Sequence, residues 1–302
     1  MTWFKRIKNL VLLCALMTTS FVKSTNLSSP INKTPTTLPQ KLPSAVDALQ
    51  SPRVTVWLHG TKSFGLISDF IHATPTQGLI HAKELPKSYR LHHTIATLSA
   101  TDPVKFPLEH FYTFGWSGKL SFNSRKETAQ ELYNALKNLS KRYTEEHGIT
   151  PEITLITHSH GGNVALNLAK VQDPDNQLKV EAILLACPVQ SETQELVKDP
   201  LFKKIYSFYS RKDWMQVLDP QGFYLTDNNL RRHWKFSERE FPAHHNLYQA
   251  ELTINNSGIN HAGFLSQEFI ALLPMLVDGS EEWKQSRPSH NKKQKKILAL
   301  IR

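Results

Sequence analysis

Short apolar, β-branched runs alternate with helical patterns from residue 51 to residue 279. Each run has the length of a buried strand and ends in residues that favour turns. The runs cover residues 54–58, 111–114, 153–157, 180–186, 205–209 and 247–254. Apolar residues at helical spacing cover 125–147, ended by Gly148, and 164–169. This alternation predicts an α/β fold with a mostly parallel, doubly wound sheet and helices on both faces.

Functional groups in such sheets gather at the carboxyl ends of the strands. Ser159 follows the run 153–157 directly and precedes a helical pattern. A serine on a tight strand-to-helix turn projects its hydroxyl above the sheet, and the turn tolerates little side-chain bulk two residues to either side. Gly161 meets that requirement, Thr157 stands where glycine is usual, and Gly162 allows helix and strand to approach closely.

With this turn the chain resembles the lipase and esterase-like members of the α/β-hydrolase superfamily over roughly residues 51–279. The other segments that carry the resemblance are Trp57-Leu58-His59-Gly60, Gly115-Trp116-Ser117-Gly118, Asp213 after a strand, and Asn260-His261-Ala262-Gly263-Phe264. The resemblance implies an α/β-hydrolase fold with cap or lid insertions. It also implies a nucleophile, an acid and a base in the chain order Ser, Asp, His.

Ser159 is the expected nucleophile, and a serine needs a histidine base that is itself oriented by a carboxylate. Asp213 is the preferred acid because it follows the run 205–209 by a short loop. Asp219 and Asp227 are its competitors. Asp213 could also be an exposed loop carboxylate beside Arg211 and Lys212, a type of pair that contributes little at a surface.

His261 is the preferred base because it follows the last strand-like run and precedes a closing helix; His244 and His245 are its rivals. The resemblance implies that the backbone N–H groups of His160 and Thr61 stabilise the oxyanion. A neutral imidazole is expected for His160 at the start of a helix. The alternative for His158 and His160 is that they pack or line the pocket, and neither is assigned a proton transfer.

Two long connections flank these residues. The stretch 213–247 is rich in aromatic residues, and it could be a lid that walls an apolar acyl pocket or a small satellite core. Its aromatic residues are Trp214, Phe223, Tyr224, Trp234, Phe236 and Phe241. Residues 62–110 form a second expected insertion.

The net charge of the 302-residue chain is +10, from 36 Lys and Arg against 26 Asp and Glu. Residues 1–24 contribute +4 and residues 280–302 contribute +5, which leaves +1 for residues 25–279. A body near neutrality argues against nucleic acid as a partner. With the N-terminal segment removed, Cys187 is the single cysteine, so no internal disulfide can form, and its place at the end of a buried strand indicates a packed, inert thiol.

The two ends have separate characters. Residues 1–24 have the basic start, short apolar run and small residues of a signal peptide cleaved after Ser24, and an uncleaved short membrane anchor or a buried helix is the alternative. Residues 25–50 are a Pro-rich arm that cannot bury enough apolar surface to fold. The basic tail 280–302 is interpreted as a solvated extension, with attachment to an anionic membrane surface as the alternative.

These observations predict an exported serine hydrolase, periplasmic, secreted or at the membrane surface, that cleaves carboxylic esters of a small molecule or lipid. The alternatives are an amidase or thioesterase with the same residues, or a non-catalytic protein that keeps the fold for binding or scaffolding. No cofactor is expected. No metal is expected either, because His72, His81, His92 and His93 lack a ligand spacing.

Overall fold

The computed structural model describes residues 52–61, 77–175, 178–219, 236–254, 257–285 and 296–300. The expected signal peptide, the Pro-rich arm and the competing carboxylate Asp227 lie outside these residues. No helix within these ranges is both long and apolar enough to cross a membrane.

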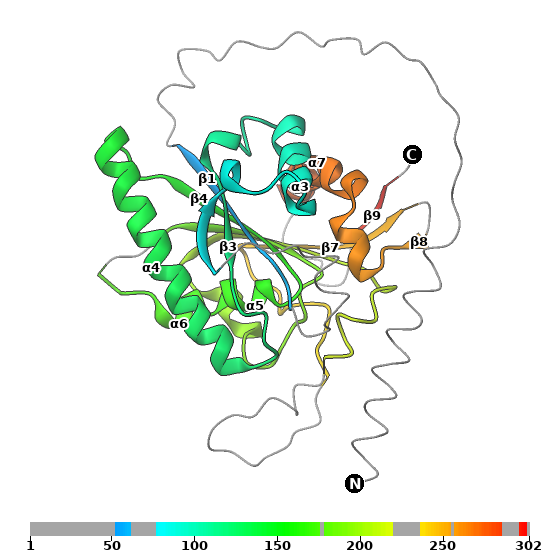
Figure 1. Ribbon diagram of the computed structural model, residues 1–302. Helices are drawn as coiled ribbons and strands as arrows, with labels where there is room; N and C mark the ends of the chain where they lie inside the picture. The colour runs from blue at the N-terminus through cyan, green and yellow to red at the C-terminus, as the bar shows by residue number, and fades with distance from the viewer. Residues whose placement is uncertain are drawn as a thin grey trace, which may run out of the picture. The chain divides into compact units, whose positions relative to one another are not determined.

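One open sheet forms the centre of the molecule (Figure 1). Its order is β2-β3-β1-β4-β5-β6-β7-β8, and β9 also pairs with β7. Neighbouring strands are parallel except β2 with β3 and β8 with β7. The strands are β1 (Arg53–Leu58), β2 (Gly78–His81), β3 (Phe111–Gly115), β4 (Glu152–His158), β5 (Val180–Leu185), β6 (Phe202–Tyr209), β7 (Leu247–Ile254), β8 (Ser257–Gly258) and β9 (Lys296–Leu300).

Helices cover both faces of this sheet, as the alternation in the sequence predicts. On one face α4 (Phe122–His147), α5 (Gly161–Leu166) and α6 (Leu168–Val171) pack on side chains such as Val56 and Leu155. On the other, α3 (Arg90–Thr101) and α7 (Gln267–Gln285) pack on Trp57 and Ile156 (Figure 1). Short 3-10 helices complete the description: η2 (Ala82–Glu84), η3 (Leu108–His110), η4 (Gln194–Lys198) and η6 (His261–Leu265). The protein therefore has an α/β fold.

Local chemistry explains most element boundaries. The expected helix 125–147 begins three residues earlier, at Phe122, because the Ser121 hydroxyl accepts the N–H of Ser124 as an N-cap. It ends at Gly148, whose φ of 72° is a left-handed conformation that glycine adopts easily. The expected helix 164–169 is divided into α5 and α6 at Asn167, whose side chain donates to the carbonyl of Asn163.

Part of the expected insertion 62–110 belongs to the fold itself. β2 extends the sheet next to β3, and α3 packs against α7. The tail also differs from the expectation of a solvated extension. Residues 280–285 belong to α7, and β9 pairs in parallel with β7 from Ala250 with Lys296 to Ile254 with Leu300.

The chain reverses its direction of travel across the sheet at β1. It runs from β1 to β3 on one side, and then through α4 to β4 on the other side of β1. The connections that leave β1 and β4 therefore go to opposite faces, and in open α/β sheets the ligand crevice is expected at the carboxyl ends of the strands at such a point. Gly60 and Ser159 lie in these two connections.

Candidate functional site

Ser159 occupies a strained turn between β4 and α5. Its φ is 53°, in the left-handed region, which costs a residue other than glycine about 1–2 kcal/mol. Its backbone N–H donates to the carbonyl of Leu185, at the end of β5, at 2.9 Å, and its carbonyl accepts the N–H of Gly162 at 3.0 Å. These bonds hold the serine in the turn in spite of the strain, an arrangement that is frequent at functional sites.

Three glycines allow the main chain to close around this turn. A Cβ on Gly161 would lie 2.6 Å from the His59 carbonyl oxygen, and one on Gly162 would lie 2.5 Å from the Cys187 sulfur. A Cβ on Gly60 would lie 2.8 Å from the Cβ of Ser159. The loop after β1 thus lies directly against Ser159, and the close approach expected from the sequence at Gly161 and Gly162 is confirmed.

Asp213 and His261 meet although 48 positions separate them in the sequence. His261 Nδ1 lies 2.7 Å from Asp213 Oδ2, and the aspartate side chain is fully buried. The other carboxylate oxygen accepts the backbone N–H of Gln216 at 3.1 Å. Because a carboxylate accepts hydrogen bonds, Nδ1 carries a proton, and in the neutral ring Nε2 is the basic nitrogen. This is the tautomer that a general base requires.

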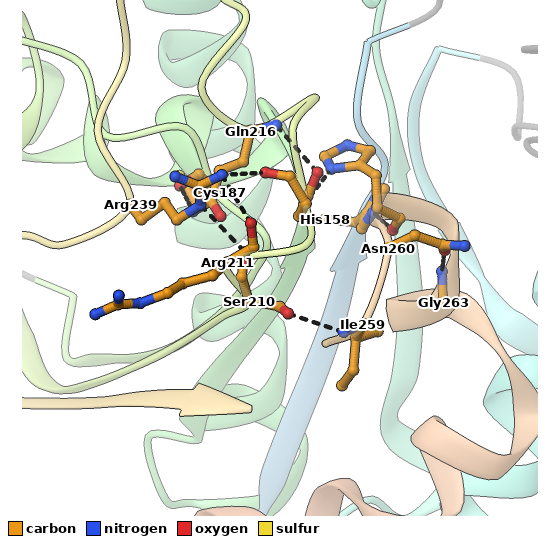
Figure 2. A network of polar contacts seen from close by, with 11 residues as sticks. His158, Cys187, Ser210, Arg211, Gln216, Arg239, Ile259, Asn260 and Gly263 are labelled. Atoms are coloured by element: carbon orange, nitrogen blue, oxygen red, sulfur yellow. Dashed lines mark hydrogen bonds and ion pairs between the residues drawn. The ribbon is translucent and has the colours of Figure 1, made fainter. Parts of the chain in front are cut away.

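Main-chain contacts hold the loop of Asp213 in place (Figure 2). The guanidinium of Arg239 donates to the carbonyls of Ser210, Arg211 and Asp213 at 2.9–3.2 Å. The Gln216 side chain donates to the Cys187 carbonyl at 2.7 Å. No pattern in the sequence singles out Arg239, because it lies far along the chain from the residues that it holds.

The loop of His261 is tied to the same region. The N–H of Ile259 donates to the Ser210 hydroxyl at 2.8 Å (Figure 2). The Asn260 side chain accepts the N–H of Gly263 and so caps η6, which begins at His261. The position of the imidazole is therefore fixed from the residues on both sides of it.

His158 connects His261 to the turn of Ser159. Its Nε2 lies 3.0 Å from the His261 carbonyl oxygen, to which it donates, and the two ring centroids are 4.6 Å apart. Because His158 immediately precedes Ser159, these contacts bring His261 to the side of the serine turn. The structure thus gathers Ser159, Asp213 and His261 at one edge of the sheet.

Trp116 and His59 hold the loop that contains Gly60 and Thr61. The Trp116 backbone N–H donates to His59 Nε2 at 3.1 Å, and its indole N–H donates to the His59 carbonyl at 2.8 Å. The two rings stack with centroids 5.6 Å apart. Thr61 is part of this loop. Within the described residues its buried hydroxyl oxygen has no hydrogen-bond partner.

Those competitors of Asp213 and His261 that the structure describes have other partners. Asp219 Oδ1 is 3.5 Å from His160 Nε2, so this carboxylate pairs with the histidine after Ser159. The rings of His244 and His245 contact each other at a tilt of 51°, with centroids 4.1 Å apart, just before β7 at the amino end of that strand. The site is formed at the carboxyl ends, which explains why they are not part of it.

Burial controls the ionisation of the other side chains near the serine. It lowers the pKa of His160, the direction expected from the sequence, although burial rather than the helix dipole is the main cause. Burial also raises the pKa of the Cys187 thiol, which agrees with a packed, inert cysteine. Among the described residues, no group of three or more His, Cys, Asp and Glu side chains could hold a metal ion.

The aromatic residues of the stretch 213–247 have different environments. Trp214 and Phe236 are 66% and 55% exposed, whereas Phe241 is buried in the hydrophobic core. Arg239 lies over the Trp214 ring, 5.8 Å from its centroid. Phe223, Tyr224 and Trp234 lie outside the described residues, so the expected lid or satellite core is not tested for them.

In comparisons with known proteins, no family model matches the chain, and no curated protein is significantly similar to it.

Proposed function

We propose that the protein is an exported serine hydrolase of the α/β-hydrolase type that cleaves carboxylic esters. The observation that carries the proposal is the bond of 2.7 Å between buried Asp213 and His261, beside a serine in a left-handed turn. If the pair of Asp213 and His261 had only a structural role, it would not require a serine beside it in a strained backbone conformation. The three side chains also come from three separate strand ends that flank the crevice predicted by the topology.

The proposed reaction has two halves. His261 Nε2 takes the Ser159 hydroxyl proton as the serine oxygen bonds to the acyl carbon. His261 then gives that proton to the departing alcohol, which leaves an acyl-enzyme. Water loses a proton to His261 and attacks the acyl carbon, and the acid is released as the proton returns to Ser159. Asp213 holds the imidazole in the required tautomer and stabilises the imidazolium.

The backbone N–H groups of His160 and Thr61 are the proposed donors to the oxyanion. Support comes from the packing of Gly60 on Ser159, which brings the loop after β1 to the serine. The bonds between Trp116 and His59 fix that loop before substrate binds, and preorganised donors stabilise a developing charge most effectively. The reaction needs no cofactor.

A fluorophosphonate probe tests the nucleophile. We expect the full-length protein and a Ser117→Ala control, which changes an exposed serine, to be labelled covalently. Ser159→Ala should not be labelled although it stays folded by circular dichroism. Equal labelling of Ser159→Ala and the natural chain would refute the proposal.

A substrate panel tests the bond that is cleaved. Short and long acyl esters should be hydrolysed faster than an amide and a thioester with the same acyl group. A preference for the amide or the thioester would redirect the proposal to those substrates with the same residues. Turnover of none of them would favour a binding or scaffolding role.

We also propose, as the alternative role of the basic tail, contact with an anionic membrane surface, and this needs a different test. Deletion of residues 286–302 would also remove β9 from the sheet. Changing Lys292 and Lys293 to Gln keeps the strand and removes charge. If the proposal holds, this variant should float less with anionic liposomes than the natural chain at low salt.

A further inference from the structure

A buried polar cluster lies behind the serine turn, on the side of α4. Its centre is His160, which is 4% exposed, and Arg125 and Asp219 lie on either side of the ring. Arg125 Nη1 is 3.2 Å from His160 Nδ1, and Asp219 Oδ1 is 3.5 Å from His160 Nε2. Arg125 is fully buried in the first turn of α4. Burying a guanidinium costs desolvation free energy, which its hydrogen-bond partners must offset.

The chemistry of the donors determines the protonation of His160. Arginine can only donate hydrogen bonds, so Nδ1 must accept and the ring proton must be on Nε2, toward Asp219. Burial keeps the ring neutral by lowering its pKa. The neutral ring of His160 therefore links the Arg125 guanidinium, through Nδ1, to the Asp219 carboxylate, through Nε2.

The neutral side chains of Gln190 and Ser237 make further hydrogen bonds to the two charged groups, Asp219 and Arg125. Asp219 Oδ2 accepts hydrogen bonds from Gln190 and Ser237, each at 2.6 Å. Burial by itself would raise the pKa of Asp219, but these bonds and the contact with His160 more than offset burial and lower it. Arg125 Nη2 donates to Gln190 Oε1 at 3.2 Å, which closes the cluster into a ring.

The cluster is therefore one cation, one anion and one neutral ring. Burial lowers the pKa of Arg125 only to about 10, so it stays charged at neutral pH. The opposite charges of Arg125 and Asp219 lie on either side of His160, so the cluster as a whole has no net charge. His261 is near enough for its positive charge to contribute to lowering the pKa of His160, so the two sites affect each other electrostatically.

We propose that Arg125 and Asp219 are positioning residues that act through His160: together they fix the main chain at residue 160, and because their charges cancel, the pair adds no net charge near His261. This inference rests on the proposed function, in which the N–H of residue 160 binds the oxyanion. A hydrophobic cluster would hold the turn equally well, but it has no charge to unbalance, so a single substitution in it would not move the titration of His261.

The other charged or titratable groups around His261 must stay constant in the test. Among the described residues, Asp213 and His158 contact His261 itself. The loops that carry Asp213 and His261 are also contacted or formed by Lys212, Arg239, Arg90 and Arg211, which pairs with Glu251. None of them is changed by the variants below.

The test measures ester hydrolysis against pH for Asp219→Asn, Arg125→Met and the double variant. Asp219→Asn leaves Arg125 unbalanced, so the acid limb of kcat/KM should move to lower pH by about half a unit. Arg125→Met should move it to higher pH, and the double variant should restore it. We expect kcat to fall about tenfold in each single variant, with KM changed little, because the donor at residue 160 is less well held.

Ser237→Ala is the matched control, because it removes one hydrogen bond to Asp219 and leaves its charge. Its acid limb should stay in place. An equal shift in Ser237→Ala, or an unchanged limb in folded Asp219→Asn, would overturn the inference. If Arg125→Met does not fold, the comparison of Asp219→Asn with Ser237→Ala decides alone.

An NMR titration of His261 in the Ser159→Ala background gives a readout that needs no turnover. Shifts of opposite sign in Asp219→Asn and Arg125→Met would support charge balance even if the natural chain hydrolyses no ester. Inactivity of the natural chain would thus refute the proposed function, whereas identical titrations in an active protein would refute only this inference.

Discussion

Gly161 lies so close to His59 that a Cβ on the glycine would be 2.6 Å from the histidine carbonyl oxygen and 2.9 Å from that of Leu58. Both are backbone atoms, which cannot move aside without displacing β1. Gly161→Ala should therefore destabilise the protein by about 1–3 kcal/mol and separate Gly60 from Ser159. Gly279→Ala in α7, where a Cβ would meet no atom within 4 Å, should instead stabilise it by about 1 kcal/mol. Urea denaturation of the two variants measures the difference, and a neutral effect of Gly161→Ala would contradict the packing.

The left-handed turn at Ser159 predicts an unusual order of stabilities. Glycine adopts a φ of 53° easily, whereas alanine keeps the strain of the natural residue. Ser159→Gly should be more stable than Ser159→Ala by about 0.5–1 kcal/mol after the greater chain entropy of glycine is subtracted. Both variants lack the proposed nucleophile, so activity does not enter the comparison. Equal midpoints in urea would mean that the turn stores no strain.

Asp213→Asn tests the orientation of His261. The amide can donate a hydrogen bond to the ring, which favours the tautomer with the proton on the wrong nitrogen. Under the proposed function kcat should fall by a factor on the order of 10⁴ without loss of fold. Asp278→Asn is a suitable control, because this aspartate pairs with Lys105 at the surface. A loss in Asp213→Asn no larger than in the control would remove Asp213 from the mechanism.

Trp116→Phe tests the clamp on the loop after β1. It removes the indole N–H that donates to the His59 carbonyl but keeps an aromatic ring to stack on the imidazole. We expect kcat to fall about tenfold and KM to change little, since a small displacement of the loop weakens transition-state contacts most. A rise in KM at constant kcat would show instead that the loop binds substrate.

His110 predicts a loss of stability in mild acid. Burial is the main cause that lowers its pKa below 6.5, and its Nδ1 lies 2.8 Å from the Tyr143 hydroxyl. The unfolded chain therefore binds a proton more readily, so the free energy of unfolding should decrease as the pH falls from about 6.5 toward the lower folded value. His110→Gln should flatten this dependence, while His93→Gln, at an exposed histidine, should not. Identical slopes in urea titrations of all three proteins would exclude a contribution from His110.

The arrangement of strand ends accounts for what the sequence could predict. Ser159, Asp213 and His261 each follow a recognisable strand, and parallel strands bring their carboxyl ends to one edge. The sequence does not distinguish the role of Asp219 from that of Asp213, because both lie in the same loop. A turn closed by the bond from the Leu218 N–H to the Trp214 carbonyl directs it back to His160, and spacing in the sequence does not reveal that turn.

Other elements gave weak or misleading signals. α3 has no side-chain cap at its start and two adjacent histidines, His92 and His93, so its helical pattern is poor. β9 follows a lysine-rich segment, and composition alone favours a solvated extension there. Its pairing with β7 depends on a long-range contact that local patterns do not encode. The positions of Arg125 and Arg239 likewise depend on tertiary packing.

The contacts of the loop from Asp213 to Asp219 restrict how many residues this loop can have. Surface loops usually accept insertions and deletions. Here one end is fixed by the bond of Asp213 to His261, the other by the contact of Asp219 with His160, and the middle by Gln216 on Cys187. Adding or removing one residue would turn at least one carboxylate away from its histidine. A connection that looks variable by position is therefore as constrained in length as a strand of the sheet.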